Sequence, residues 1–439
     1  MIETSFIKKS AWRIRHLFVS LRLRGAALGL LACLAIACSA TVLGQRRGPR
    51  GSTKPPTAAP QSKGSVNKGQ ATAVPAQDFD MLASEASAAR DGDRIDEAIT
   101  LYLKALRLKP QWAEGWWYLA TLYYDHDNYK EAAEAFKQTA QIQQKAGAPW
   151  AMLGLCEFQL ARYDEALSHI QQGRQLGLGD NLELIRVMRY HEGILAILKG
   201  NFEAAEQTLS ALSYDGLKSE ELIIALGLAS LRIGMTPKQV DINYRDRDLI
   251  RRAGLAEHFA AQKNMSDAQR EFDMLAQDYG KVANVQYAYG RFMMSNRDDE
   301  LALAAFEREI QNWPKHTLAR CQIANIKLRN KDIEGGLKYA EEAVKMAPRL
   351  PLAHYLLGRL LIEVGQSERA IQELEAAAQM VPSEPKIFFA LARAYTKANR
   401  KQDAQRARET FTKLSQAAQT EGQSSVLPDD NPATDKPQP

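Results

Sequence analysis

Three stretches in the second half of the chain repeat one another: DELALAAFEREIQNWP at 299–314, IEGGLKYAEEAVKMAP at 333–348 and SERAIQELEAAAQMVP at 367–382. Each begins 34 residues after the one before it, carries a small residue at its fourth position and ends in proline. The same step of 34 residues runs through small residues elsewhere, at Ala98, Ala132 and Ala166 and again at Ala268 and Ala404. This spacing predicts a repeated structural unit over most of residues 78–417.

The pattern inside each unit predicts two antiparallel helices. Apolar residues recur at spacings of three and four, which places them on one face of a helix. The small residues let the two helices approach closely. The prolines at the unit ends, Pro314, Pro348 and Pro382, cannot continue a helix and so end the second one. One unit cannot bury its apolar face alone, so neighbouring units are expected to stack around one continuous core.

The residues at these positions resemble the tetratricopeptide repeat (TPR), whose pattern is W-x2-L-G-x2-Y, followed by A-x3-F and P. The resemblance is carried residue by residue, by Tyr289, Gly290, Ala302, Phe306 and Pro314 in one unit and by Trp116, Leu119, Ala120, Tyr123, Ala132 and Phe136 in another. It implies an all-α fold, a right-handed superhelical solenoid of about nine helix-turn-helix units.

The repeat is irregular around residues 206–248. Residues 220–234 (EELIIALGLASLRIG) are typical of a first helix, but Pro237 breaks the pattern that should follow. We expect either a loop inserted between units or a bend that serves a partner. The final unit carries Arg408 where an apolar residue is usual, which favours a solvated capping helix.

Residues 1–44 have the layout of an export signal. Six Lys or Arg residues precede Gly25, and residues 25–44 then run without a charge. Three outcomes agree with this layout: cleavage after Gly44 or after Ala40, an uncleaved membrane anchor, and lipidation at Cys33 or Cys38. In each case the rest of the chain lies outside the cytoplasm. We therefore expect an exported protein of the periplasm or cell envelope, released or anchored by residues 25–44, whose membrane contact is confined to residues 1–44.

The formal charge of +5 belongs to the N-terminal end of the chain. Residues 45–77 hold six Lys or Arg and no acid, and they are rich in Pro, Gly, Ser and Thr, which predicts a disordered basic linker. Residues 418–439 hold four acids and one Lys, which predicts a disordered acidic tail. The repeat region between them has an excess of acidic residues, so a nucleic-acid partner is not expected.

No motif of catalysis or metal binding stands out in the sequence. There is no phosphate-binding loop, His191 and Glu192 lack the second histidine of a zinc-binding HExxH pair, and the four cysteines form no CxxC. We therefore expect no enzyme activity, no catalytic residue, no metal and no cofactor.

The TPR resemblance implies that the first helix of each unit lines a long concave groove. Carried over to the matching positions, it gives a basic groove with aromatic side chains between the charges, formed by Arg291, Asn325, Arg329, Tyr355, Arg359, Phe389, Arg393 and Lys397. Arginine and asparagine suit a carboxylate, so the groove would hold an acidic peptide or a free carboxylate. The alternative is that these charges are solvated and pair with acids of neighbouring helices.

These features predict a non-enzymatic protein–protein interaction scaffold of the bacterial cell envelope, with a protein or peptide partner bound in the concave TPR groove. Three alternatives stay open. The chain could be a structural subunit of an envelope assembly, secretion or polysaccharide-export complex. It could be a hydrolase or transferase with a site hidden in the irregular region. It could bind a membrane surface or a nucleic acid through residues 45–77.

Overall fold

The computed structural model describes residues 76–241, 244–421 and 427. These residues form nineteen α-helices and one short 3-10 helix, with no β-strand among them. The expected all-α solenoid is therefore confirmed. The expected signal segment 1–44, and all of the expected linker 45–77 except its last two residues, lie outside the described residues.

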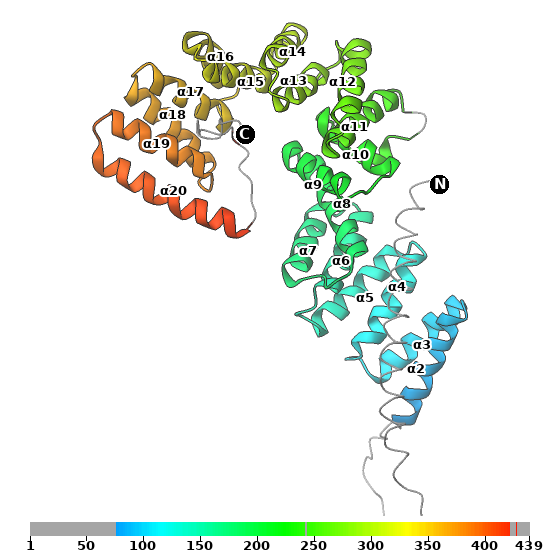
Figure 1. Ribbon diagram of the computed structural model, residues 1–439. Coiled ribbons are helices and arrows are strands. Elements are labelled where there is room, and N and C mark those ends of the chain that lie inside the picture. Colours follow the sequence, from blue (N-terminus) through cyan, green and yellow to red (C-terminus); the bar gives the residue numbers. More distant parts are fainter. Residues whose placement is uncertain (1–75, 242–243, 422–426, 428–439) are drawn as a thin grey trace, which may run out of the picture. The chain divides into compact units, whose positions relative to one another are not determined.

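The first compact unit is residues 1–192, and its described part, from residue 76 on, contains three helix pairs and the first part of α8 (Leu182–Leu198). The two helices of each pair lie side by side (Figure 1). Each second helix buries one large side chain completely: Tyr102, Phe136 and Ile170. The pairs are α2 (Ala76–Asp91) with α3 (Ile95–Leu108), α4 (Ala113–Asp125) with α5 (Tyr129–Ile142), and α6 (Gly147–Gln159) with α7 (Tyr163–Leu176).

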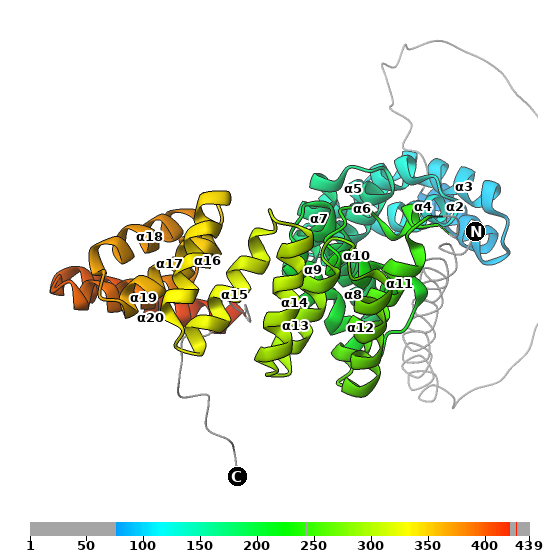
Figure 2. The same ribbon diagram turned by 90° about the horizontal axis from the view of Figure 1, so that it is seen from above.

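The second compact unit, residues 193–439, begins inside α8 and continues with further helix pairs, several of which are seen along their length in Figure 2. Its helices are α9 (Phe202–Tyr214), α10 (Glu220–Ser230), α11 (Arg247–Ala261), α12 (Met265–Tyr279), α13 (Val285–Ser295), α14 (Asp299–Asn312), α15 (Thr317–Arg329), α16 (Ile333–Met346), α17 (Pro351–Glu363), α18 (Ser367–Met380), α19 (Pro385–Lys397) and α20 (Lys401–Glu421).

Close packing within each pair explains the small residues of the repeat. Gly358 of α17 faces Leu374 of α18, and a Cβ atom on Gly358 would lie 2.5 Å from Leu374 Cγ. A side chain at that position would force the two helices apart. The turn between paired helices uses one residue in the left-handed region, where the chain reverses: Asp93, Asp127, Ala161, Gly200, Lys263, Arg297, Lys331, Gly365 and Asn399.

The irregular region is shorter than the expected range 206–248: the chain departs from regular helix pairs only between the end of α10 and the start of α11, at residues 231–246. The chain leaves α10 through a left-handed residue, Arg232 (φ 57°), as it does at the other turns. Pro237 then begins a 3-10 helix of three residues, Pro237–Gln239, instead of a full second helix. The unit that starts with α10 therefore has the usual turn after its first helix but no second α-helix after that turn.

Helix α11 takes the place of that missing second helix. Gly227 of α10 and Gly254 of α11 face each other, and a Cβ atom on Gly227 would lie 1.8 Å from the carbonyl oxygen of Ile250. Only two glycines allow the backbones to come this close. The insertion therefore lies between α10, which has no second helix of its own, and the α11–α12 pair, whose first helix packs on α10.

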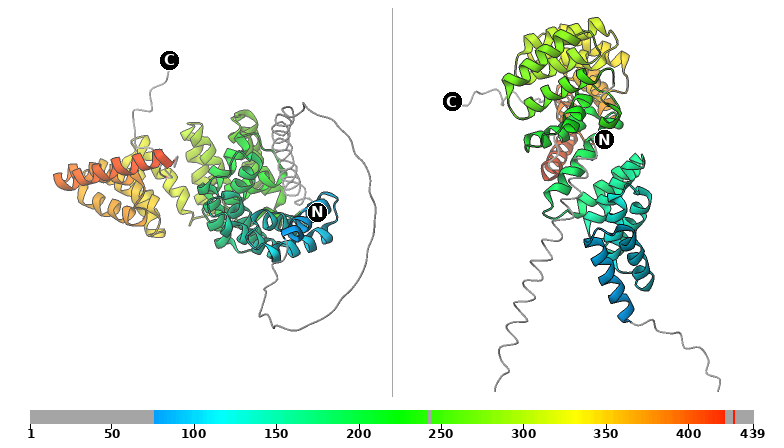
Figure 3. Two further views of the ribbon diagram at one scale, coloured as in Figure 1. Left: turned by 90° about the horizontal axis from the view of Figure 1, so that it is seen from below. Right: turned by 90° about the vertical axis from the view of Figure 1, so that its right-hand side faces the viewer.

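The helical region extends beyond both of its expected limits. Helix α2 begins at Ala76, and α20, drawn in red in Figure 3, ends at Glu421, inside the expected tail 418–439. Alanine, glutamine and glutamate favour helix, which explains why α20 continues. Leu427 is a second difference, because it is only 7% exposed and belongs to the apolar cluster that extends over α15–α20.

Candidate functional site

One hollow on the last helix pair brings together residues that the sequence analysis assigned to the groove. Its volume is about 560 Å³. Helices α19 and α20 both contribute to it, and its lining residues are Phe389, Ala392, Arg393, Thr396, Lys397, Arg408, Phe411 and Thr412. We call it the α19–α20 pocket. Three of the predicted groove residues, Phe389, Arg393 and Lys397, line it.

The α19 side of the pocket follows from helix geometry. Phe389, Arg393 and Lys397 are each four residues apart, so they lie on one face of the helix. Pro385 occupies the first turn, where its missing N–H costs nothing. The carboxylate of Glu384 accepts a hydrogen bond from the Lys386 N–H at 3.2 Å and caps the same end. The helix therefore starts at a defined residue and presents this face in a fixed register.

The α20 side of the pocket was missed by the sequence analysis, which considered only the first helix of each unit. Arg408 and Phe411 lie one turn apart on α20. The ring centroid of Phe411 is 5.4 Å from that of Phe389, which is 37% exposed. The signal that could have found this side is Arg408 itself, a cation at a position that is usually apolar.

The pocket has an excess of positive charge, because only one of its three cations is paired with a carboxylate of the described residues. Arg393 Nη2 donates to Glu363 Oε1 at 2.9 Å. Lys397 Nζ donates instead to the carbonyl oxygen of Ile362 at 2.8 Å, and Arg408 Nη2 donates to Thr396 Oγ1 at 2.9 Å. Among the described residues, neither of these last two cations forms an ion pair with a carboxylate. The pocket is therefore an apolar hollow with three cations at its edge.

Two other predicted groove cations pair with acids inside the protein. Arg291 of α13 makes a two-pronged ion pair with Glu206 of α9, at 2.7 and 2.5 Å. Arg329 of α15 meets Asp299 of α14 at 2.5 Å. The second interpretation of the sequence, pairing with acids across neighbouring helices, describes these two residues. Their charges brace the solenoid.

The remaining predicted groove residues face inward. Tyr355 of α17 is fully buried and Asn325 of α15 is 4% exposed, although both were expected to line an open groove. Arg359 is half-buried, with its guanidinium 5.4 Å from the ring centroid of Tyr355. The large apolar faces of α15 and α17 explain the difference, because these helices pack on both sides within the stack. The basic, aromatic character predicted for the whole groove is concentrated on the last pair.

A buried polar network lies in the second unit, around the irregular region. Ser230 Oγ of α10 donates to Glu257 Oε1 of α11 at 2.7 Å. Burial, together with the neighbouring negative charge of Glu206, raises the pKa of Glu257 to about 7. Burial would lower the pKa of Arg291, but the charge and the hydrogen bonds of Glu206, together with the charges of Tyr287 and Glu257, outweigh it and raise that pKa. Four helices, α9, α10, α11 and α13, meet through these side chains.

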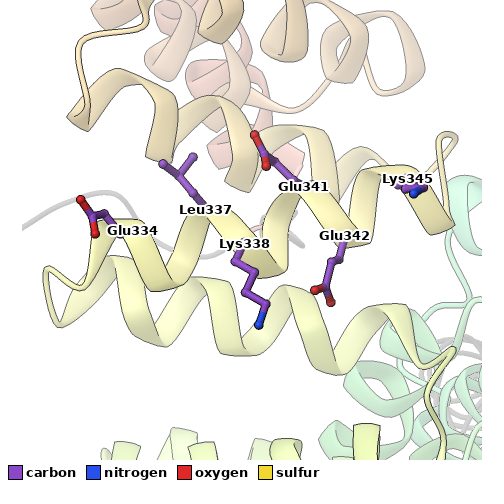
Figure 4. A pocket seen from close by; sticks show the side chains of 6 residues that line it. All are labelled: Glu334, Leu337, Lys338, Glu341, Glu342 and Lys345. Carbon is purple, nitrogen blue, oxygen red and sulfur yellow. The ribbon is translucent and has the colours of Figure 1, made fainter.

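A second hollow, of about 470 Å³, lies on the outer face of α16. All of its lining residues come from that one helix (Figure 4): Glu334, Leu337, Lys338, Glu341, Glu342 and Lys345. Charges of both signs alternate along it, which is typical of a solvated helix surface. It lacks the aromatic pair and the single sign of charge that mark the α19–α20 pocket.

Within the described ranges, no three His, Cys, Asp or Glu side chains are grouped so that they could hold a metal ion. In the same part of the chain, no helix combines the length and the apolar character needed to cross a bilayer. Cys156 and Cys321 are both buried and unbridged.

Comparison with known proteins adds the family. A family profile described as tetratricopeptide repeat matches residues 321–385 and again residues 355–419. Residues 321–419 therefore match the tetratricopeptide-repeat family. Residues 91–173 also match a profile described as subunit 3 of the anaphase-promoting complex, or cyclosome. No curated protein sequence matches the chain.

The chain also matches solved structures, at low sequence identity and with low TM-scores. Residues 41 to the end of MamA from Desulfovibrio magneticus RS-1 are 23% identical, with a TM-score of 0.33, and the match covers 38% of this chain and 94% of that one. YrrB, described as a TPR protein with an unusual peptide-binding site, is 15% identical, with a TM-score of 0.33 and coverage of 39% and 89%. The Cut9–Hcn1 complex is 13% identical, with a TM-score of 0.35 and coverage of 77% and 87%.

Proposed function

We propose that this protein is a non-enzymatic interaction scaffold whose last helix pair binds an acidic segment, or a free carboxylate, of a protein partner. The observation that carries the proposal is the α19–α20 pocket, where three cations surround two neighbouring phenylalanine rings. TPR proteins generally act as scaffolds rather than catalysts.

The chemistry of the pocket suits such a segment. Arg393 and Arg408 offer planar forks that can hold a carboxylate through two parallel hydrogen bonds. The exposed face of Phe389 can take an apolar side chain next to that carboxylate. Aromatic and arginine side chains placed together are also the residues that contribute most of the binding energy in protein interfaces.

We place this scaffold in the bacterial cell envelope. The support is the sequence of residues 1–44, a basic stretch followed by twenty uncharged residues. The partner would then be a periplasmic or membrane protein, reached while the chain is released or anchored by residues 25–44.

A second candidate function is that of a structural subunit in an envelope assembly, secretion or polysaccharide-export complex. The ion pairs of Arg291, Arg329 and Arg393 with acids of other helices favour it, because these charges are already used inside the solenoid. A structural subunit would hold its partner through a broad surface, so two changed charges in one pocket would have little effect on it.

Capture of partners from a detergent-solubilised envelope extract separates the two candidates. The bait is the tagged full chain, compared with Lys397→Glu/Arg408→Glu in the pocket and with Lys338→Glu/Lys345→Glu on α16. The control pair is exposed, makes the same change of charge and lies outside the pocket. Circular dichroism and thermal melting of all three baits establish that the substitutions leave the fold intact.

We expect the parent and the α16 variant to retain the same partner and the pocket variant to lose it. If the pocket variant retains that partner at the parent level, the pocket is not the binding site and the structural-subunit function is the better account. A milder pair, Lys397→Ala/Arg408→Ala, gives the same comparison if the glutamate pair lowers the melting temperature.

A further inference from the structure

The α19–α20 pocket lies next to a segment of its own chain. Leu427 is buried and belongs to the apolar cluster that extends over α15–α20, and its carbonyl oxygen accepts a hydrogen bond from the ammonium group of Lys386. Lys386 precedes Phe389 by three residues and Arg393 by seven, so all three lie on one face of α19. Leu427 is thus held on the face of α19 that carries the pocket.

The residues that follow Leu427 have the composition that the pocket would recognise. Residues 428–439 read PDDNPATDKPQP, with three aspartates and one lysine. Each of its four prolines has a fixed φ angle and restricts the residue before it, which reduces the conformational entropy that the segment loses when it binds. Its negative charge complements Arg393, Lys397 and Arg408.

The distances are also compatible. From Lys386 to Arg393 the helix rises about 10 Å, at about 1.5 Å per residue. Three extended residues cover about the same length, at about 3.3 Å each, so Asp430 can reach Arg393 from the position of Leu427. Lys397 and Arg408 lie within reach of the rest of the segment.

We propose that residues 428–439 occupy the α19–α20 pocket of their own chain and compete there with the partner. This inference rests on the proposed function, because it assigns an internal competitor to the same site. Attachment through Leu427 gives the segment an effective concentration in the millimolar range. A partner must displace the segment from the pocket in order to bind. The segment therefore lowers the apparent affinity of the scaffold for its partner, and only a partner that binds tightly enough is retained.

The test uses a fluorescein-labelled synthetic peptide of residues 428–439 as the probe and fluorescence anisotropy as the readout. Four proteins are titrated: the full chain, the chain ending at Leu427, the full chain with Asp429→Asn/Asp430→Asn/Asp435→Asn, and the shortened chain with Lys397→Glu/Arg408→Glu. The triple variant keeps every residue of α19 and α20, so it controls for any loss of structure on shortening.

We expect the shortened chain and the triple variant to bind the peptide about tenfold or more tightly than the full chain does, because the internal competitor is gone or uncharged. The Lys397→Glu/Arg408→Glu change should abolish this binding. Equal binding by the full and shortened chains, or binding that ignores the pocket charges, overturns the inference. A full chain that is dimeric by light scattering, and monomeric when shortened, also overturns it, because the segment then occupies a second copy.

This result is distinguishable from the fate of the proposed function. If the peptide fails to bind while the envelope partner is still lost from the pocket variant, the scaffold function stands and the internal competitor does not. If the peptide binds in the pocket but partner capture does not depend on the pocket charges, the segment is a ligand of the pocket and the proposed binding function of the pocket is wrong.

Discussion

At the scale of single residues, a cluster of charged side chains lies largely buried near the irregular region of the second unit. The cluster contains two carboxyl groups, of Glu206 and Glu257, and only one positive charge, that of Arg291. The three residues come from three different helices. Arg291 bonds directly to Glu206, whereas Glu257 receives its hydrogen bond from Ser230. Glu257 is therefore the member of the cluster that holds a proton most readily.

The first prediction concerns the pH dependence of stability. The pKa of Glu257 is about 7 in the folded chain and about 4.5 when the side chain is solvated, so the folded state retains a proton that the unfolded state has lost. The stabilisation is complete below about pH 4.5 and is lost as the pH rises to about 7. Glu257→Gln should therefore gain about 2 kcal/mol of unfolding free energy relative to the parent between those pH values.

Urea unfolding of Glu257→Gln and of the parent, at pH values from 5 to 8, measures this difference. The parent must be run in parallel because of two histidines, His191, which is buried, and His316, which is partly buried. Burial lowers both pKa values to about 4 and gives these histidines the opposite pH dependence. A difference between the two proteins that does not change with pH contradicts the assignment of Glu257.

The second prediction compares a largely buried ion pair, Arg291 with Glu206, with a more exposed one, Arg329 with Asp299. Arg291→Met leaves Glu206 buried without its partner and should cost about 3 kcal/mol of stability. Adding Glu206→Leu should recover at least half of that loss, because an apolar pair can replace a buried ion pair. Arg329→Met is the matched control, since its side chain is 41% exposed, and it should cost less than about 1 kcal/mol. If both substitutions lower the unfolding free energy equally, the ion pair of Arg291 contributes no more to stability than a surface ion pair does, which contradicts the prediction.

The residue scale also shows where the sequence was insufficient. Phe389, Arg393 and Lys397 could be placed on one face because they follow the repeat register. Arg291 follows the same register, yet its partner Glu206 lies 85 residues away across the insertion. No period connects these two positions, so the sequence could not distinguish an internal ion pair from a free groove cation.

At the scale of elements, the contact between α10 and α11 depends on two glycines. Gly227→Ala should destabilise the chain by about 2 kcal/mol or more, because the new methyl group meets the Ile250 carbonyl oxygen at 1.8 Å and the helices must separate. Gly234→Ala is the control, since its Cβ atom would meet nothing closer than 3.8 Å, and it should change stability by less than about 0.5 kcal/mol. Thermal melting of both variants decides this, and equal melting temperatures contradict the packing described.

The elements themselves were predicted more completely than their partners. The period of 34 residues places nearly every helix pair, because each unit repeats the same small residues and turn. The sequence also predicted a first helix at 220–234, which corresponds to α10. It could not predict that α11 packs on α10, since this contact depends on an insertion whose length follows no period. The position of Leu427 lies outside the repeat altogether.

At the scale of the whole molecule, a solenoid transmits disturbances only between neighbours, because each helix pair contacts mainly the pairs next to it. Gly227→Ala should therefore raise amide hydrogen exchange in α9–α12 and leave the exchange of α17–α19 unchanged. Hydrogen-exchange mass spectrometry of the variant and the parent tests this. A rise that extends through α17–α19 would mean that the second unit unfolds as one cooperative body.

The central claim is that the α19–α20 pocket is the contact site for a partner, and photo-crosslinking in living cells of the source organism tests it most directly. A benzophenone amino acid replaces Phe389 in the pocket or, as control, Met346 at the end of α16, two side chains of similar exposure. We predict a discrete adduct with another envelope protein from position 389, absent from position 346 and suppressed by Lys397→Glu/Arg408→Glu. Identical adducts from both positions, or none from position 389, would contradict the account.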